Sequence, residues 1–318
     1  MSSAVLCLTP NPALDRTLTV SGLRLGTVAR APSARVAAGG KGVNVARALA
    51  ALGTEALCMG PIGGASGRIL ADLAASEDLD AAWTWCEVET RSCIILVDPA
   101  ARRTTVINEA GPPLQPIDWN RVSAEVLARA PEARAVCLSG SLPPGVAADG
   151  LAELCRSLVE SGQAPWVDSS GAALAAALSV AGVRLKINRE EAEELLGRPL
   201  RGVAACADAA QRLLARGMSA VVLTLGDEGA VFAEAEGCWR AASPPLETAS
   251  AVASGDSFLA GLVAALAAGR EVPEALRWGV AAGAANALAE GGARFTRAQF
   301  DSILVGVRCG PERPLTGT

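Results

Sequence analysis

The chain has 318 residues, of which 51% are hydrophobic and only 3% aromatic, so a large core would have to be built from alanine, leucine and valine. The formal charge is −5 and the sequence contains no run of basic residues, which argues against nucleic acid or an anionic membrane surface as the main partner. Because histidine is absent, a Ser-His catalytic triad is excluded and the usual zinc sites nearly so.

The nine cysteines are an odd number, lie in apolar stretches and lack metal-ligand spacing, which favours free thiols over disulfides. The N-terminus does not have the pattern of a secretory signal, and no stretch approaches 18 uninterrupted apolar residues. We therefore expect a cytoplasmic protein with one main domain and a small appendage, acting on small molecules.

The first predicted element is a buried strand over residues 4–8, which ends where two prolines, Pro10 and Pro12, force an extended turn. Asp15 follows this turn. In open α/β sheets ligands bind beyond the carboxyl ends of the strands, so Asp15 is placed to hold sugar hydroxyls. A solvated loop acid remains the alternative.

Short β-rich runs predict a second, small sheet. Residues 16–36 alternate as exposed strands do, and residues 93–97 and 104–108 flank a polar turn and predict a hairpin. We expect residues 13–36 and 88–110 to form a discontinuous β lid over the main domain. Since a small sheet with one apolar face needs a cover, we also expect this lid to pair with a second copy in a homodimer.

A first glycine cluster contains Gly39, Gly40, Lys41 and Gly42 and leads into a helix that begins near Asn44. Glycine lets the backbone approach a ligand closely, and Asn44 could cap the helix or bind hydroxyls. The spacing matches neither a Walker A loop nor Gly-x-Gly-x-x-Gly, and a purely structural turn is the alternative.

Strand, polar or glycine-rich turn and helix then alternate along the chain, which is typical of a parallel sheet covered on both faces. The turns should all fall at one edge of that sheet. The predicted strands are residues 56–60, 135–138, 166–168, 185–187 and 220–225, and the predicted helices run from about 149 to 160 and up to residues 75, 178 and 196.

Residues 250–258 carry the most chemical information. They place Asp256 at the start of an apolar helix over residues 257–268. The unpaired N–H groups of such a helix start bind anions, and Asp256 beside them could accept the proton of an alcohol that attacks phosphorus. On these nine residues alone, capping of the helix by Asp256 is the better interpretation.

The two glycine clusters, more than 200 residues apart, together resemble the two signatures of the PfkB carbohydrate kinase family. This resemblance implies a ribokinase-like three-layer α/β/α sandwich with a mostly parallel central sheet and a kinase domain over residues 1–310. The composition of residues 311–318, with prolines at 311 and 314, predicts a flexible tail. It covers nearly the whole chain, at residues 11–15, 90–91, 108–109, 111–112, 139–145, 168–171, 186–191, 224–229 and 281–286.

The resemblance implies an ATP-dependent sugar-phosphate kinase. Asp256 would be the base, and Gly255, Ser254 and Ala253 would form the anion hole. The residues that would hold the sugar phosphate are Asp15, Gly39, Gly40, Lys41, Asn44, Arg91 and Ser139.

Asn188 and Glu191 resemble the family motif that organises Mg²⁺ largely through water, and a monovalent cation such as K⁺ is left open as a further cofactor. The residues that resemble the nucleotide-binding positions are Lys186, Asn188, Thr224, Gly226, Gly229, Ser250 and Asn286.

The chain departs from the family at Ala253, where Gly is usual, and at Ile187, where Pro is usual. Lys41 favours 1-phosphofructokinases and tagatose-6-phosphate kinases, whereas residues 63–67 and 167–171 resemble the 6-phosphofructokinase branch. We favour fructose 1-phosphate as the acceptor. The alternative from another class is a non-catalytic sugar-phosphate or nucleotide sensor, against which the retained Asp256 argues; a Rossmann dehydrogenase would need a glycine motif that residues 9–12 lack.

Overall fold

The main sheet is built from short strands of apolar residues that are buried on both faces. In β1 (Val5–Leu8), Val5 and Cys7 pack in one hydrophobic core and Leu6 and Leu8 in another, because alternate side chains of a strand point to opposite faces. The computed structural model describes residues 4–246, 252–289 and 291–313, and within them ten strands follow the order β14-β13-β12-β11-β10-β9-β8-β1-β4-β5. Seven neighbours run parallel: β1, β4 (Ala56–Gly63), β5 (Ala81–Cys86), β8 (Ala135–Ser139), β9 (Trp166–Asp168), β10 (Arg184–Asn188) and β11 (Ala220–Thr224).

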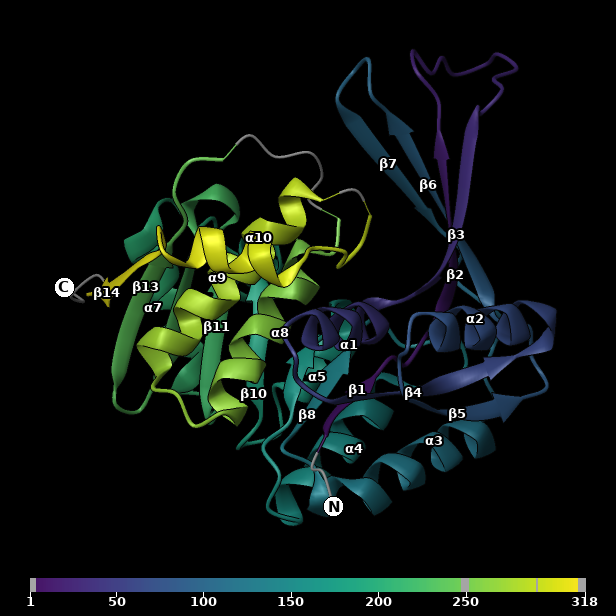
Figure 1. Ribbon diagram of the computed structural model, residues 1–318. Helices are drawn as coiled ribbons and strands as arrows, with labels where there is room; N and C mark the ends of the chain where they lie inside the picture. The colour runs from purple at the N-terminus through teal and green to yellow at the C-terminus, as the bar shows by residue number, and fades with distance from the viewer. Residues whose placement is uncertain (1–3, 247–251, 290, 314–318) are drawn as a thin grey trace.

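Helices cover both faces of this sheet, which makes the predicted three-layer sandwich (Figure 1). Buried residues of α1 (Lys41–Ala51), α2 (Gly64–Ser76), α8 (Ser254–Ala267), α9 (Val272–Leu288) and α10 (Arg297–Leu304) belong to the core on one face. Those of α3 (Pro116–Arg129), α4 (Ala148–Glu160), α5 (Gly171–Ala177), α6 (Arg189–Leu196) and α7 (Val203–Leu214) belong to the core on the other. Among the described residues, the structure has no helix with the length and apolar character needed to span a bilayer.

Three antiparallel strands extend the sheet beyond β11. A short 3-10 turn, Gly226–Glu228, reverses the chain after β11, and the positive φ of 62° at Gly226 and 92° at Gly229 suits glycine. Residues 311 and 312, predicted to begin a flexible tail, are instead held by the sheet. Pro311 pairs with Trp239, and the Glu312 N–H donates to the Cys238 carbonyl at 2.9 Å. The added strands are β12 (Ala230–Glu234), β13 (Gly237–Ala242) and β14 (Arg308–Pro311).

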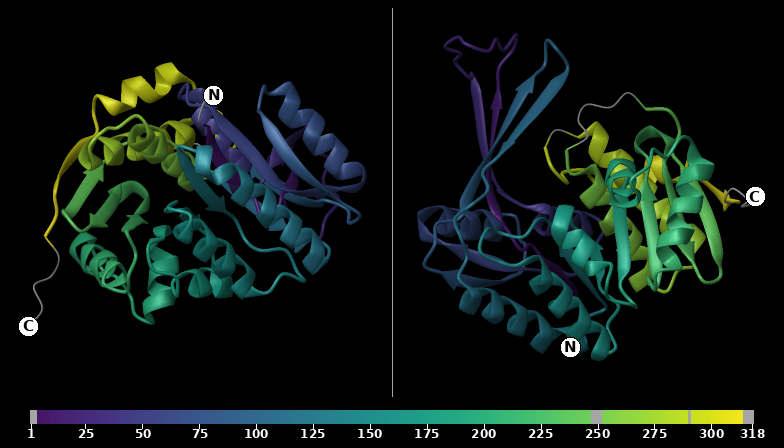
Figure 2. Two further views of the ribbon diagram at one scale, coloured as in Figure 1. Left: turned by 90° about the horizontal axis from the view of Figure 1, so that it is seen from below. Right: turned by 180° about the vertical axis from the view of Figure 1, so that it is seen from behind.

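The predicted small sheet has four strands in the order β3-β2-β6-β7 and projects from the main domain (Figures 1 and 2). The hairpin expected over residues 93–108 is confirmed by β6 and β7. Residues 20–32, in contrast, form a loop, so the strands expected over 16–36 are confined to the two ends of that range. The strands are β2 (Ala13–Thr19), β3 (Ser33–Gly39), β6 (Arg91–Asp98) and β7 (Arg103–Asn108).

Candidate active site

A cavity of about 790 Å³ lies where the carboxyl ends of the parallel strands meet the base of the small sheet. Thr9, Gly140 and Ser170, which follow β1, β8 and β9, line it from the main sheet, as the edge prediction requires. The small sheet contributes Asp15 and Arg91. The first turns of α1 and α8 complete the wall with Lys41, Asn44, Ala253 and Asp256.

Asp256 is buried in the first turn of α8 and does not cap its helix. Its Oδ2 accepts a hydrogen bond of 2.8 Å from Nδ2 of Asn44, a residue 212 positions away on α1, and α8 has no side-chain cap among the described residues. Burial and the neighbouring Asp168 carboxylate raise the pKa of Asp256, against the lowering effects of Lys41, Lys186 and the Asn44 bond. A raised pKa suits a carboxylate that accepts a proton near neutral pH.

The turn before α8 presents the unpaired N–H groups of the helix start next to Asp256. Ala253 is left-handed (φ 61°, ψ 11°), so this position does use the conformation that the family usually gives to glycine. Ser257 makes the first helical bond, to the Ala253 carbonyl, which leaves the N–H groups of Ser254, Gly255 and Asp256 without helical partners. A Cβ on Gly255 would lie 2.8 Å from the Lys186 ammonium, so glycine lets this cation approach the helix start.

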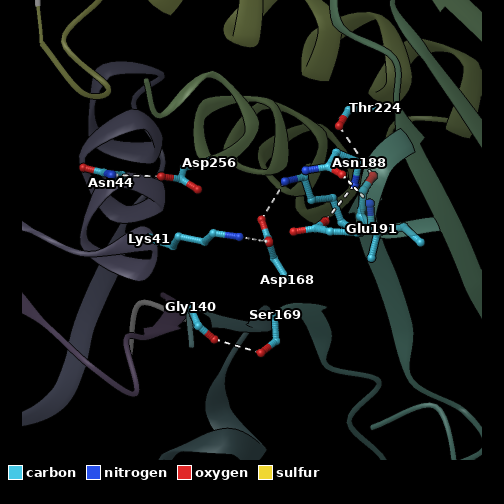
Figure 3. Close-up of polar contacts among 11 residues, drawn as sticks. Lys41, Asn44, Gly140, Asp168, Ser169, Asn188, Glu191, Thr224 and Asp256 are labelled. Carbon is cyan, nitrogen blue, oxygen red and sulfur yellow. Dashed lines mark hydrogen bonds and ion pairs between the residues drawn. The ribbon is translucent and has the colours of Figure 1, made fainter. Parts of the chain in front are cut away.

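Two lysines share one buried carboxylate at the centre of the site (Figure 3). Lys41 and Lys186 donate to Oδ1 and Oδ2 of Asp168 at 2.6 and 2.7 Å, and the Asp168 side chain is 0% exposed. Burial acts against ionisation of Asp168, but the two lysines outweigh it and lower its pKa. The three groups together carry one net positive charge, which suits a site for phosphate.

Asp15 projects from β2 into the same cavity, next to the first glycine cluster. A Cβ on Gly39 would lie 2.2 Å from the Asp15 carboxyl carbon, so this glycine makes room for the acid. Burial raises the pKa of Asp15 to about 6, although Arg47 and Arg91 lower it and Asp256 raises it further. Asp15 therefore sits in the site itself and is not the solvated loop acid that the sequence left open.

Arg91 is fixed at the start of β6 by backbone carbonyls. Its Nε and Nη2 donate to the Asn11 carbonyl at 3.2 and 2.9 Å, and its Nη1 donates to the Glu109 carbonyl at 2.7 Å. These bonds use three of the five N–H groups of the guanidinium and leave two for a ligand.

The hydroxyl of Ser139, predicted to hold substrate, does not line the cavity. Ser139 ends β8 and is fully buried, and its Oγ has no partner among the described residues. Its neighbours Gly140 and Ser141 line the cavity in its place. The substrate role that the family resemblance implies for Ser139 therefore remains a prediction, and its buried hydroxyl does not reach the cavity wall.

Asn188 and Glu191 lie on the far side of Asp168 from Asp256 (Figure 3). They form a reciprocal capping box at the start of α6, with the Glu191 N–H donating to Asn188 Oδ1 at 2.8 Å and the Asn188 N–H donating to Glu191 Oε2 at 2.9 Å. A carboxylate keeps further lone pairs after one such bond, so this pair fits a hydrated Mg²⁺ better than direct coordination.

The other predicted nucleotide positions do not line the described cavity. Lys186 and Thr224 lie at the same sheet edge as Asn188, and Gly226 begins the turn after β11. Gly229 packs against β13, since a Cβ there would lie 2.0 Å from the Ala241 carbonyl oxygen. Ser250 lies outside the described residues.

Asn286 of α9 is engaged within the protein. Its Nδ2 donates to the Val252 carbonyl at 2.7 Å and to Ser254 Oγ at 3.0 Å, and its Oδ1 accepts from the Ala293 N–H at 2.7 Å. These contacts give Asn286 the task of holding the turn before α8.

Sequence reasoning did not single out Asp168 or Arg47. Asp168 ends a predicted strand, and this position at the ligand edge was the available signal. Arg47 lies on the helix that follows the first glycine cluster and has no motif of its own; only its contacts with Asn44 reveal it.

The fold and this site define an α/β phosphotransferase in which a buried carboxylate lies beside an anion-binding helix start. The chain matches the model of the pfkB family carbohydrate kinases over residues 11–298, and it belongs to this family. It is 37% identical to a 1-phosphofructokinase of Xanthomonas campestris over 84% of this chain and 85% of that protein. It is 34% identical to the ATP-dependent 6-phosphofructokinase isozyme 2 of Escherichia coli over 80% and 82%.

Solved structures agree with this assignment. The tetrameric inhibited form of phosphofructokinase-2 from E. coli matches with a TM-score of 0.89 and 31% identity over 95% of this chain and 98% of that one. A complex of phosphofructokinase-2 with potassium gives the same TM-score and identity over 96% and 99%. The predicted ribokinase-like fold and kinase class are therefore confirmed.

Proposed function

We propose that the protein transfers the γ-phosphoryl group of ATP to a ketohexose monophosphate and that the acceptor is fructose 1-phosphate. The observation that carries the proposal is the Asp256 carboxylate, which Asn44 holds in the cavity, beside the first N–H groups of α8 that have no partner within the helix. The choice of fructose 1-phosphate is supported by Lys41 and by relatives named 1-phosphofructokinase at 37% and 34% identity.

In this proposal Asp15 and Asn44 bind sugar hydroxyls, and Arg91 and Lys41 bind the phosphate that the sugar already carries. Asp256 accepts the proton of the attacking hydroxyl, and the N–H groups of Ser254 and Gly255 stabilise charge on the transferred group. Mg²⁺, when bound near Asn188 and Glu191, would neutralise charge on the ATP phosphates. The potassium complex of E. coli phosphofructokinase-2 supports K⁺ as a further cofactor to test.

We also propose that the small sheet closes over the cavity and pairs with a second copy. Ile107 of β7 is 54% exposed, and Val28, in the loop that joins β2 to β3, is 90% exposed, so both apolar side chains face solvent in a single copy. A homodimer would bury them.

The nine cysteines are all within the described residues and are free thiols, which supports a reducing compartment such as the cytoplasm.

A coupled assay with ATP and fructose 1-phosphate, fructose 6-phosphate or tagatose 6-phosphate tests the acceptor. We expect kcat/KM to be highest for fructose 1-phosphate by at least about tenfold, a difference of about 1.4 kcal/mol. A higher kcat/KM for either other sugar would move the assignment to that branch. Binding of a sugar phosphate without turnover would favour the sensor.

A further inference from the structure

Arg47 is a buried cation that contacts the amide holding Asp256. It lies on α1, one turn after Asn44, and is 7% exposed. Its Nη1 donates to Asn44 Oδ1 at 2.9 Å, while Nδ2 of the same amide donates to Asp256 at 2.8 Å. The three side chains therefore form one chain of hydrogen bonds that ends at the base.

The direction of this chain is fixed by chemistry. A guanidinium can only donate hydrogen bonds, so the atom of Asn44 that faces Arg47 must be the carbonyl oxygen. The NH₂ group then has to face Asp256. Without Arg47 the amide could rotate by half a turn and present its oxygen to the carboxylate, which would repel it.

The same guanidinium holds two other parts of the site. Its Nη2 donates at 2.6 Å to the carbonyl of Ala38, the residue of β3 that directly precedes Gly39 and the first glycine cluster. Its Nε pairs with Glu77 Oε2 at 2.5 Å, and Glu77 in turn pairs with Arg294. Glu77 thus supplies the counter-charge that a buried arginine needs.

We propose that Arg47 is a positioning residue, which orients the Asn44 amide toward Asp256 and fixes the end of β3 relative to that pair. Arg47 does not line the cavity, so it acts through Asn44 and the backbone and has no contact with the reacting atoms. The proposal concerns kinase turnover and rests on the proposed function for its substrate.

Arg277 provides a matched control. Arg47 donates to the backbone carbonyls of Ala38 and, at 3.5 Å, Gly292, and Arg277 donates to those of Val307 at 3.0 Å and Leu304 at 2.9 Å. Arg277 likewise pairs with a glutamate, Glu274, at 2.7 Å. These partners lie around α9, α10 and β14, outside the cavity lining. Arg277→Met therefore removes the same kind of clamp without touching Asn44.

The experiment measures kcat and KM for ATP and fructose 1-phosphate in Arg47→Met, Arg277→Met, Asn44→Ala and the Arg47→Met/Asn44→Ala double variant. We expect kcat to fall at least about tenfold in Arg47→Met and less than about twofold in Arg277→Met. In the Asn44→Ala background, Arg47→Met should lower kcat by a smaller factor than it does in wild type, because its contact with the Asn44 amide is already removed and only its hold on the end of β3 remains. Two results would overturn the proposal. One is a kcat loss in the double variant equal to the product of the losses in the two single variants, and the other is a kcat for Arg47→Met within twofold of wild type.

Two further measurements keep the proposal testable if Arg47→Met does not fold or if no turnover is detected. Arg47→Lys keeps the charge but cannot span all three partners, so a folded Lys variant should still lose several-fold in kcat. The pKa of Asp256, followed by ¹³C NMR of its carboxyl, should rise in Arg47→Met and not in Arg277→Met; an unchanged pKa in both contradicts the proposal without any assay. The charged groups that face Asp256 and are not substituted in these variants are Asp15 of β2, Lys41 of α1, Asp168 of β9 and Lys186 of β10. Of these, Asp15 also responds to the loss of Arg47, which lowers its pKa in wild type.

If wild type turns over no sugar phosphate, the proposed function fails, while the NMR comparison still decides the role of Arg47.

Discussion

At the scale of single residues, the binding role proposed for Asp15 comes with a cost in stability. Its pKa is raised from 3.8 to about 6 in the folded protein, mainly by burial. A raised pKa means that folding favours the protonated acid, so this contribution to stability is complete below pH 3.8 and is lost as the pH rises through about 6. At neutral pH Asp15 is ionised, and the folded protein is less stable than it would be with Asp15 protonated.

Asp15→Asn should therefore raise the free energy of unfolding at pH 7.5 by on the order of 1–3 kcal/mol and change it little at pH 4. Urea unfolding at both pH values measures this. Affinity for the sugar phosphate should fall in the same variant, because a hydroxyl loses its charged acceptor. An equal change in unfolding free energy at both pH values would contradict the raised pKa.

Ala253 holds a left-handed conformation that costs an alanine about 1–2 kcal/mol. Ala253→Gly removes this strain but gains about 0.5–1 kcal/mol of unfolded-chain entropy, so the net gain in stability should be at most about 1 kcal/mol. Since alanine and glycine supply the same N–H, kcat/KM should change less than about tenfold. Ala133→Gly, at an extended φ of −78°, is the control and should only destabilise.

An inert wild type whose turnover Ala253→Gly restores by several orders of magnitude would identify the natural protein as a degenerate kinase and would favour the sensor.

At the scale of elements, the small sheet leaves apolar side chains exposed that no other part of the same chain covers among the described residues. Its outer strand β7 is mostly exposed along its length, and Ile107 faces solvent there. A sheet of four short strands with one apolar face gains stability when another surface covers that face. The proposed homodimer provides such a surface.

Ile107→Glu should convert the dimer into a monomer, because the interface would have to bury a charge. Light scattering after size-exclusion chromatography at micromolar concentration reads the mass. Val305→Glu at the end of α10, where Val305 is 86% exposed, is a matched control that should leave the mass unchanged. A monomeric wild type would contradict the proposed dimer.

At the scale of the whole molecule, the sequence predicted the layers and the ligand edge because these depend on local signals. Short, mostly apolar runs of three to five residues followed by glycine or polar turns give β1, β8 and β10 within one residue of their observed bounds. The antiparallel strands β12 to β14 were not predicted, since the reversal depends on two glycines whose φ values the sequence does not display.

The site was predictable only in part. Asp256, Asn44 and Asp15 lie together as expected, whereas the pairing of Asp168 with Lys41 and Lys186 joins segments 127 and 18 residues apart. Such pairing depends on the order of strands in the sheet, which spacing alone does not determine. The burial of Ser139 and the internal contacts of Asn286 likewise depend on side-chain direction in the folded chain.

The central claim is that Asp256, brought to the cavity from the opposite end of the chain, accepts the proton of the attacking hydroxyl. Its most direct test is the kcat of Asp256→Asn with saturating ATP and fructose 1-phosphate, alongside calorimetric binding of ATP to the same variant. We expect kcat to fall on the order of 10²-fold or more, with the fold and ATP affinity retained, because asparagine keeps the shape of the side chain but cannot accept the proton. A kcat within a few-fold of wild type would contradict the role of Asp256 as the base.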